Sequence, residues 1–188
     1  QEPDMVALTG DYVSYVLEDV AEDLERCLSM IEVKDASLAV LGNHDHWNGA
    51  NEIRQILKNA GIMDVSNDVY SISKDGEKGV ANLHIAGVDS MKLNKEDIDA
   101  VMLKIPEHGP AIMLAHEPDY VSLYQSLGAD LVLTGHVHGG QIIIPGVGGV
   151  ISPEFEFFPK PYEGMYDHNG TTIVLSRGLR NSVAPVRI

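Results

Sequence analysis

Apolar residues along this chain fall into short runs, and the runs alternate with longer stretches in which apolar positions recur every three or four residues. Buried strands read as nearly continuous apolar runs, whereas amphipathic helices show the longer period. The apolar runs are residues 5–9, 37–41, 111–115 and 131–134, with 83–86 and 172–176 as further candidates. We therefore expect strands at these positions, in an α/β fold of one domain over residues 1–188.

The helical stretches are marked by acidic first turns and by ordinary stop residues such as Gly61 and Pro106. They are residues 18–31, residues 51–60, residues 94–105, and a stretch that begins at Pro118 and ends by Gly128. Glycine and proline crowd residues 139–162. We expect irregular or hairpin structure there.

The charge of the chain bears on its partners. The formal net charge is −15, from 28 acidic and 13 basic residues. Such a surface repels phosphate backbones and anionic head groups within a Debye length, so we expect no nucleic-acid partner. Bound divalent cations can reverse this field locally, which leaves a small anionic substrate compatible with the acidic shell.

The single cysteine, Cys27, excludes disulfides within the chain and a zinc site built from cysteines. Its spacing from neighbouring apolar residues predicts a place on the buried stripe of the helix over residues 18–31. No apolar run is long enough to span a membrane, so we predict no membrane segment in this chain. Gln1 and the residues after it are unlike a natural start, so we expect an absent upstream segment. The protein would then be cytoplasmic, or membrane-associated through that segment.

Polar side chains follow four of the predicted strands, at the point where each strand ends. They belong to Gly10-Asp11, Gly42-Asn43-His44-Asp45, Ala115-His116 and Gly135-His136-Val137-His138. In open α/β sheets, ligands bind outside the carboxyl ends of the strands, so we expect these four loops to converge on one site.

The residue types at these strand ends suit divalent metals. Asp11 offers a carboxylate, Asn43 an amide oxygen, and His116, His136 and His138 offer imidazoles, a mixture that fits Mn, Fe or Zn. Asp11 can bridge two ions, which would lie roughly 3.5–4 Å apart, polarise a phosphoryl group and activate a bridging water. The alternative, residues that merely cap helices, suits Asp11 and Asn43 but gives the three histidines no purpose.

In their order and spacing, these motifs resemble those of the calcineurin-like metallophosphoesterases. The resemblance implies a β-sandwich of mixed sheets flanked by helices. It implies that Asp11 bridges two ions, and that His138 binds one of them. The other ion would be completed by Asn43, His116 and His136.

The same resemblance implies a metal-dependent phosphoester hydrolase that uses a metal-bound hydroxide. His44 would lie beside the phosphate, where it stabilises the transition state or protonates the leaving oxygen. Asp45 would fix the tautomer of His44. His46 either contacts substrate or shapes its loop, and Gln141 either reaches the phosphate or pairs with backbone.

One motif of this family is missing from the chain, namely an Asp-x-His at the end of an earlier strand. We therefore expect the first strand to be lacking and at most one well-occupied metal. The alternative function is a catalytically silent module that binds a metal or a phosphate. Residues 135–142 also resemble a bacterial, often membrane-anchored subgroup, which implies a phosphodiester or pyrophosphate substrate, small or lipid-linked. The oligomeric state is left open.

Overall fold

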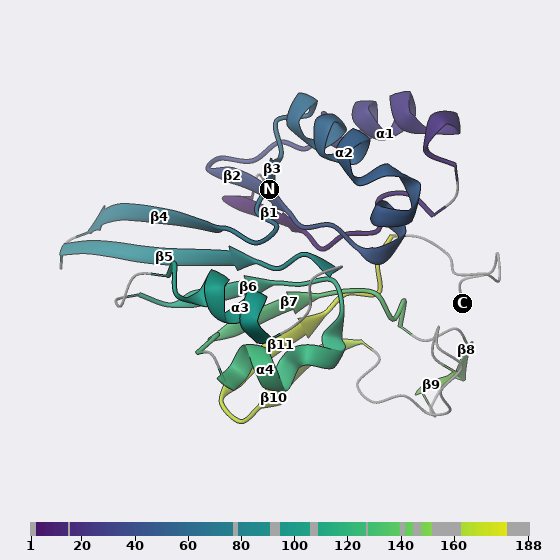
Figure 1. Ribbon diagram of the computed structural model, residues 1–188. Helices are drawn as coiled ribbons and strands as arrows, with labels where there is room; N and C mark the ends of the chain where they lie inside the picture. The colour runs from purple at the N-terminus through teal and green to yellow at the C-terminus, as the bar shows by residue number, and fades with distance from the viewer. Residues whose placement is uncertain are drawn as a thin grey trace.

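The chain folds as a sandwich with two β-sheets in the middle and helices on both outer faces (Figure 1). The computed structural model describes residues 3–14, 16–76, 79–90, 95–105, 109–126, 128–139, 142–144, 148–151 and 163–179. Helices α1 and α2 cover one sheet, and α3 and α4 cover the other (Figure 1). The predicted α/β sandwich of mixed sheets is confirmed.

The smaller sheet has the order β1-β2-β3, with all strands parallel. The larger sheet has the order β10-β11-β7-β6-β5-β4, with a parallel centre and antiparallel strands at both edges. The bounds are β1 (Met5–Leu8), β2 (Ala36–Ala39), β3 (Met63–Asp64), β4 (Val69–Gly76), β5 (Gly79–Gly87), β6 (Ala111–Leu114), β7 (Leu131–Thr134), β10 (Gly164–His168) and β11 (Thr171–Leu175). All six predicted strands are present, and the three that sequence reasoning did not predict, β3, β4 and β10, are edge strands.

A separate hairpin joins β8 (Ile142–Ile144) and β9 (Gly148–Ile151). It lies in the glycine- and proline-rich stretch for which hairpin or irregular structure was predicted. Residues 140–141, 145–147 and 152–162 of that stretch lie outside the described residues, and Gln141 is among them.

The helices lie close to the predicted positions, with two informative differences. They are η1 (Leu17–Asp19), α1 (Ala21–Leu28), α2 (Asn43–Asn59), α3 (Lys95–Met102), η3 (Pro118–Tyr120) and α4 (Val121–Ser126). The predicted helix over 18–31 divides into η1 and α1. Helix α2 begins at Asn43 instead of residue 51, because a further helical segment precedes the predicted one and is joined to it through a bend at Gly49. Within the described residues, no helix is long and apolar enough to cross a membrane.

The strands that position the site are buried on both faces, which explains their continuous apolar runs. On β2 and just beyond it, Leu38 and Val40 pack between the two sheets, whereas Ala39 and Leu41 pack against α1 and α2. Strand β6 alternates in the same way between the inter-sheet layer and the layer under α3 and α4. Three apolar layers therefore hold the strand ends in place.

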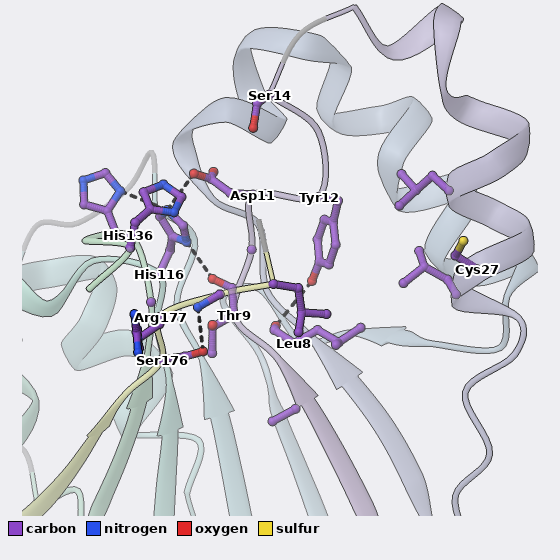
Figure 2. A pocket seen from close by; sticks show the side chains of 18 of the residues that line it. Leu8, Thr9, Asp11, Tyr12, Ser14, Cys27, His116, His136, Ser176 and Arg177 are labelled. Carbon is purple, nitrogen blue, oxygen red and sulfur yellow. Dashed lines mark hydrogen bonds and ion pairs between the residues drawn. The ribbon is translucent and has the colours of Figure 1, made fainter. Parts of the chain in front are cut away.

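The prediction that Cys27 is buried is wrong, because this residue is exposed. Helix α1 turns Leu28 into the apolar layer that it shares with α2, and Leu24 packs at the margin of that layer. Cys27 instead faces the cavity that runs from the site along β1 (Figure 2). The apolar stripe of α1 is thus narrower than its sequence pattern indicated.

We expect Leu38→Ala to lower the free energy of unfolding by about 2–5 kcal/mol, because it leaves a cavity between the sheets. Leu38 has no solvent exposure, whereas Leu103 is 85% exposed. Leu103→Ala is the matched control and should change stability by less than about 0.5 kcal/mol. Urea unfolding followed by far-ultraviolet circular dichroism measures both, and equal effects of the two variants would contradict the inter-sheet position of Leu38.

Candidate metal centre

Four strand ends meet at one edge of the sandwich and bring the predicted ligands together. Asp11 follows β1, His116 follows β6, and His136 follows β7. Their ligand atoms all lie within 4.8 Å of one another. Figure 2 shows the three side chains turned toward one another above the strands. The convergence that strand-end chemistry predicted is therefore present, although Asp11 is more than 100 positions from both histidines in the sequence.

His116 is the centre of this cluster and is nearly fully buried. Its Nε2 lies 3.1 Å from Asp11 Oδ2 and 3.0 Å from His136 Nδ1. Its Nδ1–H donates to the carbonyl oxygen of Thr9 at 2.6 Å. A ligating histidine commonly donates its second ring N–H to a carbonyl, which fixes the tautomer and turns the other nitrogen to the metal. His116 has this arrangement, with Nε2 facing the cluster.

The groups of the cluster shift the pKa values of their neighbours. Burial alone would raise the pKa of Asp11, but His116 beside it holds that pKa below its ordinary value. Burial alone would lower the pKa of His116, but the hydrogen bond to Asp11 raises it overall. Burial lowers the pKa of His138, which favours the neutral imidazole that a metal requires. His138 lies outside the tight cluster but lines the same cavity.

Three predicted ligands have an uncommon backbone conformation. Asp11, His136 and His138 have φ angles of 59°, 69° and 55°, in the left-handed region that is strained for non-glycine residues. Such strain persists only when the surrounding structure enforces it, and it clusters at functional sites. The strained backbone places the side chains of Asp11 and His136 in the cluster and that of His138 on the lining of the cavity.

Asp45 enforces the conformation of the loop after β1. It is fully buried, and its Oδ2 accepts hydrogen bonds from the backbone N–H of Asp11 at 2.7 Å and of Gly42 at 2.9 Å. Its Oδ1 accepts from the N–H of Tyr12 at 2.8 Å. Burial raises the pKa of Asp45, and the backbone donors oppose that rise only in part. This carboxylate therefore ties the loop after β1 to the start of α2.

The predicted role of Asp45 in orienting His44 is wrong. Both residues are described, and no hydrogen bond joins the Asp45 carboxylate to the His44 ring. The physical reason is that α2 begins earlier than predicted, and consecutive residues of a helix point in different directions. His44 instead donates its backbone N–H to Asp11 Oδ1 at 3.0 Å, and its ring lies 4.8 Å from that of Trp47.

The two loops approach each other so closely that glycine is required on both sides. A Cβ atom at Gly10, where φ is +89°, would lie 2.4 Å from the backbone nitrogen of Gly42. A Cβ atom at Gly42 would lie 2.2 Å from Asp11 Oδ1. These contacts explain why a Gly precedes both Asp11 and Asn43 in the sequence.

Asn43 provides a test of whether the site fits a metal. Its Oδ1 is buried and has no hydrogen-bond partner. Buried polar atoms nearly always have a partner, so an unpaired amide oxygen on a predicted metal ligand needs an explanation. A divalent cation coordinated there explains it, and the donor set suits Mn, Fe or Zn. The residues present therefore fit the group that the sequence predicted.

The ring of His46 contacts Asp89, which is not one of the predicted metal ligands. Its Nε2 lies 2.5 Å from Oδ1 of Asp89, which follows β5 and is almost fully buried. Of the two alternatives left open by the sequence, this contact favours shaping the loop over binding substrate. Asp89 was missed by sequence reasoning, although Gly87, Val88 and Asp89 repeat the pattern of an apolar run that ends in a polar residue.

The cluster opens into a cavity of about 580 Å³ that runs along β1 toward α1. One end is lined by the cluster and His138, and the other by apolar side chains of α1 and its extension, Leu24, Leu28 and Ile31. Arg177, which also lines the cavity, is paired with Glu163 at 2.7 Å. The cavity is therefore polar beside the predicted metal ligands and apolar at the end beside α1.

Comparison with known proteins agrees with this architecture. The family model of the calcineurin-like phosphoesterases matches residues 1–140. An uncharacterised metallophosphoesterase, YkuE of Bacillus subtilis, is 30% identical over 99% of this chain and 64% of its own length. The phosphodiesterase YaeI of Escherichia coli is 30% identical over 81% of this chain and 55% of its own length. The chain belongs to the calcineurin-like phosphoesterase family, whose members generally bind divalent metals.

A solved structure shares the fold at much lower sequence identity. It is GAP50, described as the anchor in the inner membrane complex of Plasmodium. The TM-score is 0.59 at 14% identity, over 91% of this chain and 60% of that one. The chain thus spans less than two thirds of the length of each of these three proteins.

We expect Mn²⁺ added to chelator-treated protein to raise the melting temperature, by roughly 2–4 °C for each kcal/mol of binding. His116→Ala should abolish this increase, because His116 lies at the centre of the cluster. His168→Ala is the control, since His168 is the last residue of β10 and contacts Ser122. Differential scanning calorimetry provides the measurement. An undiminished Mn²⁺ shift in His116→Ala would exclude this cluster as the metal site.

Proposed function

We propose that this chain is the metal-binding part of a phosphoester hydrolase of the phosphodiesterase or pyrophosphohydrolase type. The observation that carries the proposal is the convergence of Asp11, His116 and His136, and the unpaired Oδ1 of Asn43 supports it. The relationship to a phosphodiesterase of Escherichia coli supports the same reaction class. When divalent ions are bound, they polarise the phosphoryl group and activate the attacking water.

We propose that one ion lies among Asp11, Asn43, His116 and His136. A second ion would share Asp11 and take His138, as a dinuclear centre requires. Among the described residues the first position has four candidate ligands and the second has two. The first position is therefore expected to hold its ion more tightly. The Asp-x-His motif expected upstream of this segment stays a prediction.

We propose that His44 acts on the substrate itself. Its backbone N–H is held by Asp11, and the ring stands beside Trp47 at the start of α2. A histidine in this place can donate a proton to the leaving oxygen or stabilise negative charge that develops on the phosphoryl group. Asp45 contributes indirectly, since it holds the backbone of the loop that carries Asp11.

The cavity supports a small or lipid-linked phosphoester as substrate. Its apolar end, at Leu24, Leu28 and Ile31, suits a substrate with an apolar group beyond the phosphate. The net charge of −15 disfavours nucleic acid.

The second candidate function is a catalytically silent module that binds one metal or a phosphorylated ligand. It is favoured by one observation, namely that His138 lies outside the tight cluster of Asp11, His116 and His136 among the described residues. The two candidates differ in whether the protein turns over an ester, which makes them separable by experiment.

We expect hydrolysis of bis-p-nitrophenyl phosphate in the presence of Mn²⁺, with metal content determined by elemental analysis. The chain should be compared with a version extended upstream in the natural gene. Activity and a second metal in the extended version would support the hydrolase and its dinuclear centre. If neither version hydrolyses the ester or holds a second metal, the hydrolase is rejected and the binding module is favoured.

We expect His44→Asn to reduce kcat by about 10²–10⁴-fold, because it removes a group that transfers a proton or stabilises charge. The metal content should not change, since Asp11, Asn43, His116 and His136 are intact. Steady-state kinetics with bis-p-nitrophenyl phosphate and elemental analysis of the same sample provide the two measurements. Full activity in His44→Asn would remove this residue from the mechanism.

A further inference from the structure

Helix α2 consists of two helical segments that meet at Gly49. This residue has a φ of +115°, which is not helical, and a Cβ atom there would lie 2.8 Å from Glu52 Oε2. Residues 43–48, which we call the catalytic turn, carry Asn43 and His44. Residues 50–59 form the part of α2 whose Ile53 and Leu57 are completely buried in the core. A flexible residue thus separates the catalytic turn from its scaffold.

Asp89 spans this bend with its two carboxylate oxygens. Oδ1 lies 2.5 Å from Nε2 of His46, on the catalytic turn. Oδ2 accepts a hydrogen bond at 3.0 Å from Arg54, on the scaffold side. Asp89 is only 4% exposed, so these contacts lie in an environment that strengthens charge-assisted hydrogen bonds.

The two contacts of Asp89, one with His46 and one with Arg54, are called the Asp89 bracket below. This bracket is connected by further hydrogen bonds to both sheets. The backbone N–H of Asp89 donates to Asn67 Oδ1 at 3.1 Å. Arg54 also donates its Nε–H to Asp64 Oδ2 at 2.8 Å, and the other oxygen of Asp64 accepts from the N–H of Ser66 at 2.9 Å. Asp64 belongs to β3 of the smaller sheet, whereas Asp89 follows β5 of the larger one. The bend in α2 is therefore fixed relative to the whole sandwich.

We propose that Asp89 is a positioning residue, which sets the angle of the catalytic turn at Gly49 through His46 and Arg54. Asn43 and His44 stand at the far end of this turn, so a small rotation at Gly49 displaces them from the metal cluster. A misplacement of about 1 Å at a reacting centre can cost about 10²-fold in rate. The kinetic consequence rests on the proposed hydrolase function, whereas the conformational consequence does not.

The single tryptophan of the chain can report how firmly the catalytic turn is held. Trp47 is the single tryptophan of the chain, lies on the catalytic turn and is 68% exposed. The fast component of its time-resolved fluorescence anisotropy therefore reports local motion at the turn, whereas the slow component reports the tumbling of the whole protein. This readout does not depend on activity.

The test compares Asp89→Asn with Asp130→Asn. Asparagine keeps the shape of Asp89 but turns an NH₂ group toward a donor, so one arm of the bracket is lost. Asp130 is the matched control, because its Oδ2 accepts the backbone N–H of Ala111 at 2.8 Å at the start of β6, the end of the strand opposite the site. We expect Asp89→Asn to increase the fast local motion of Trp47 and to lower kcat about 10–100-fold with KM within about twofold. Asp130→Asn should change neither.

A double-mutant cycle separates positioning from substrate contact by His46. If His46 acts through Asp89, His46→Ala and Asp89→Asn have similar effects on kcat that do not add, and His46→Gln, which keeps an N–H donor, restores part of kcat. If His46→Ala raises KM and Asp89→Asn does not, His46 contacts substrate and the proposal is overturned.

Two further outcomes separate a failure of the proposed hydrolase function from a failure of the proposed role of Asp89. If the wild-type chain hydrolyses no ester, the hydrolase function fails, and the anisotropy of Trp47 alone decides the role of Asp89. If Asp89→Asn fails to fold, Arg54→Met removes the other arm of the same bracket and replaces it in the comparison. Unchanged Trp47 motion in the folded variant would overturn the proposal.

Discussion

The contact between the loop after β1 and the start of α2 is the constraint on which the site depends. The buried Asp45 carboxylate collects three backbone N–H groups from these two segments. The two glycines, Gly10 and Gly42, let the backbones come close enough for this to happen. The hydrogen bonds to Asp45 stabilise the left-handed conformation of Asp11. Without them, Asp11 would not be held beside the histidines, and the polar residues at this edge of the sandwich would not form a cluster.

Much of the fold and of the candidate site could be predicted from the sequence, because the strands concerned are buried on both faces. Double burial produces continuous apolar runs, and those runs show where each strand ends. A polar residue at such an end has a predictable location even when its partners are far away in the sequence. The positions of Asp11, His116 and His136 follow from this argument alone.

The features that were missed share a different physical cause, which is that they depend on tertiary contacts between polar groups. Asp45 lies in a run of ligand-like residues, and nothing local distinguishes a carboxylate that holds backbone N–H groups from one that orients a histidine. Strands β4 and β10 lie at sheet edges, where burial is partial and the apolar signal is weaker. Cys27 fits a helical stripe in sequence, yet packing with α2 uses only part of that stripe.

The charges of the metal cluster differ from those of the chain as a whole. The chain carries a large negative net charge, yet two of the three residues in the metal cluster that the structure describes are histidines. Each of Asp11 and His116 shifts the pKa of the other, lowering that of Asp11 and raising that of His116. Because a ligating imidazole must be neutral, metal binding at His116 would compete with its protonation.

The left-handed backbone at Asp11, His136 and His138 also limits which mutations these positions can accept. Apart from glycine, the residues that tolerate this conformation best are asparagine, aspartate and histidine. Those are also side chains that bind divalent cations. Backbone geometry and coordination chemistry thus select from the same small set of amino acids, so that drift at these positions is restricted twice. A chain that lost its catalytic activity could keep the same three residues for conformational reasons alone.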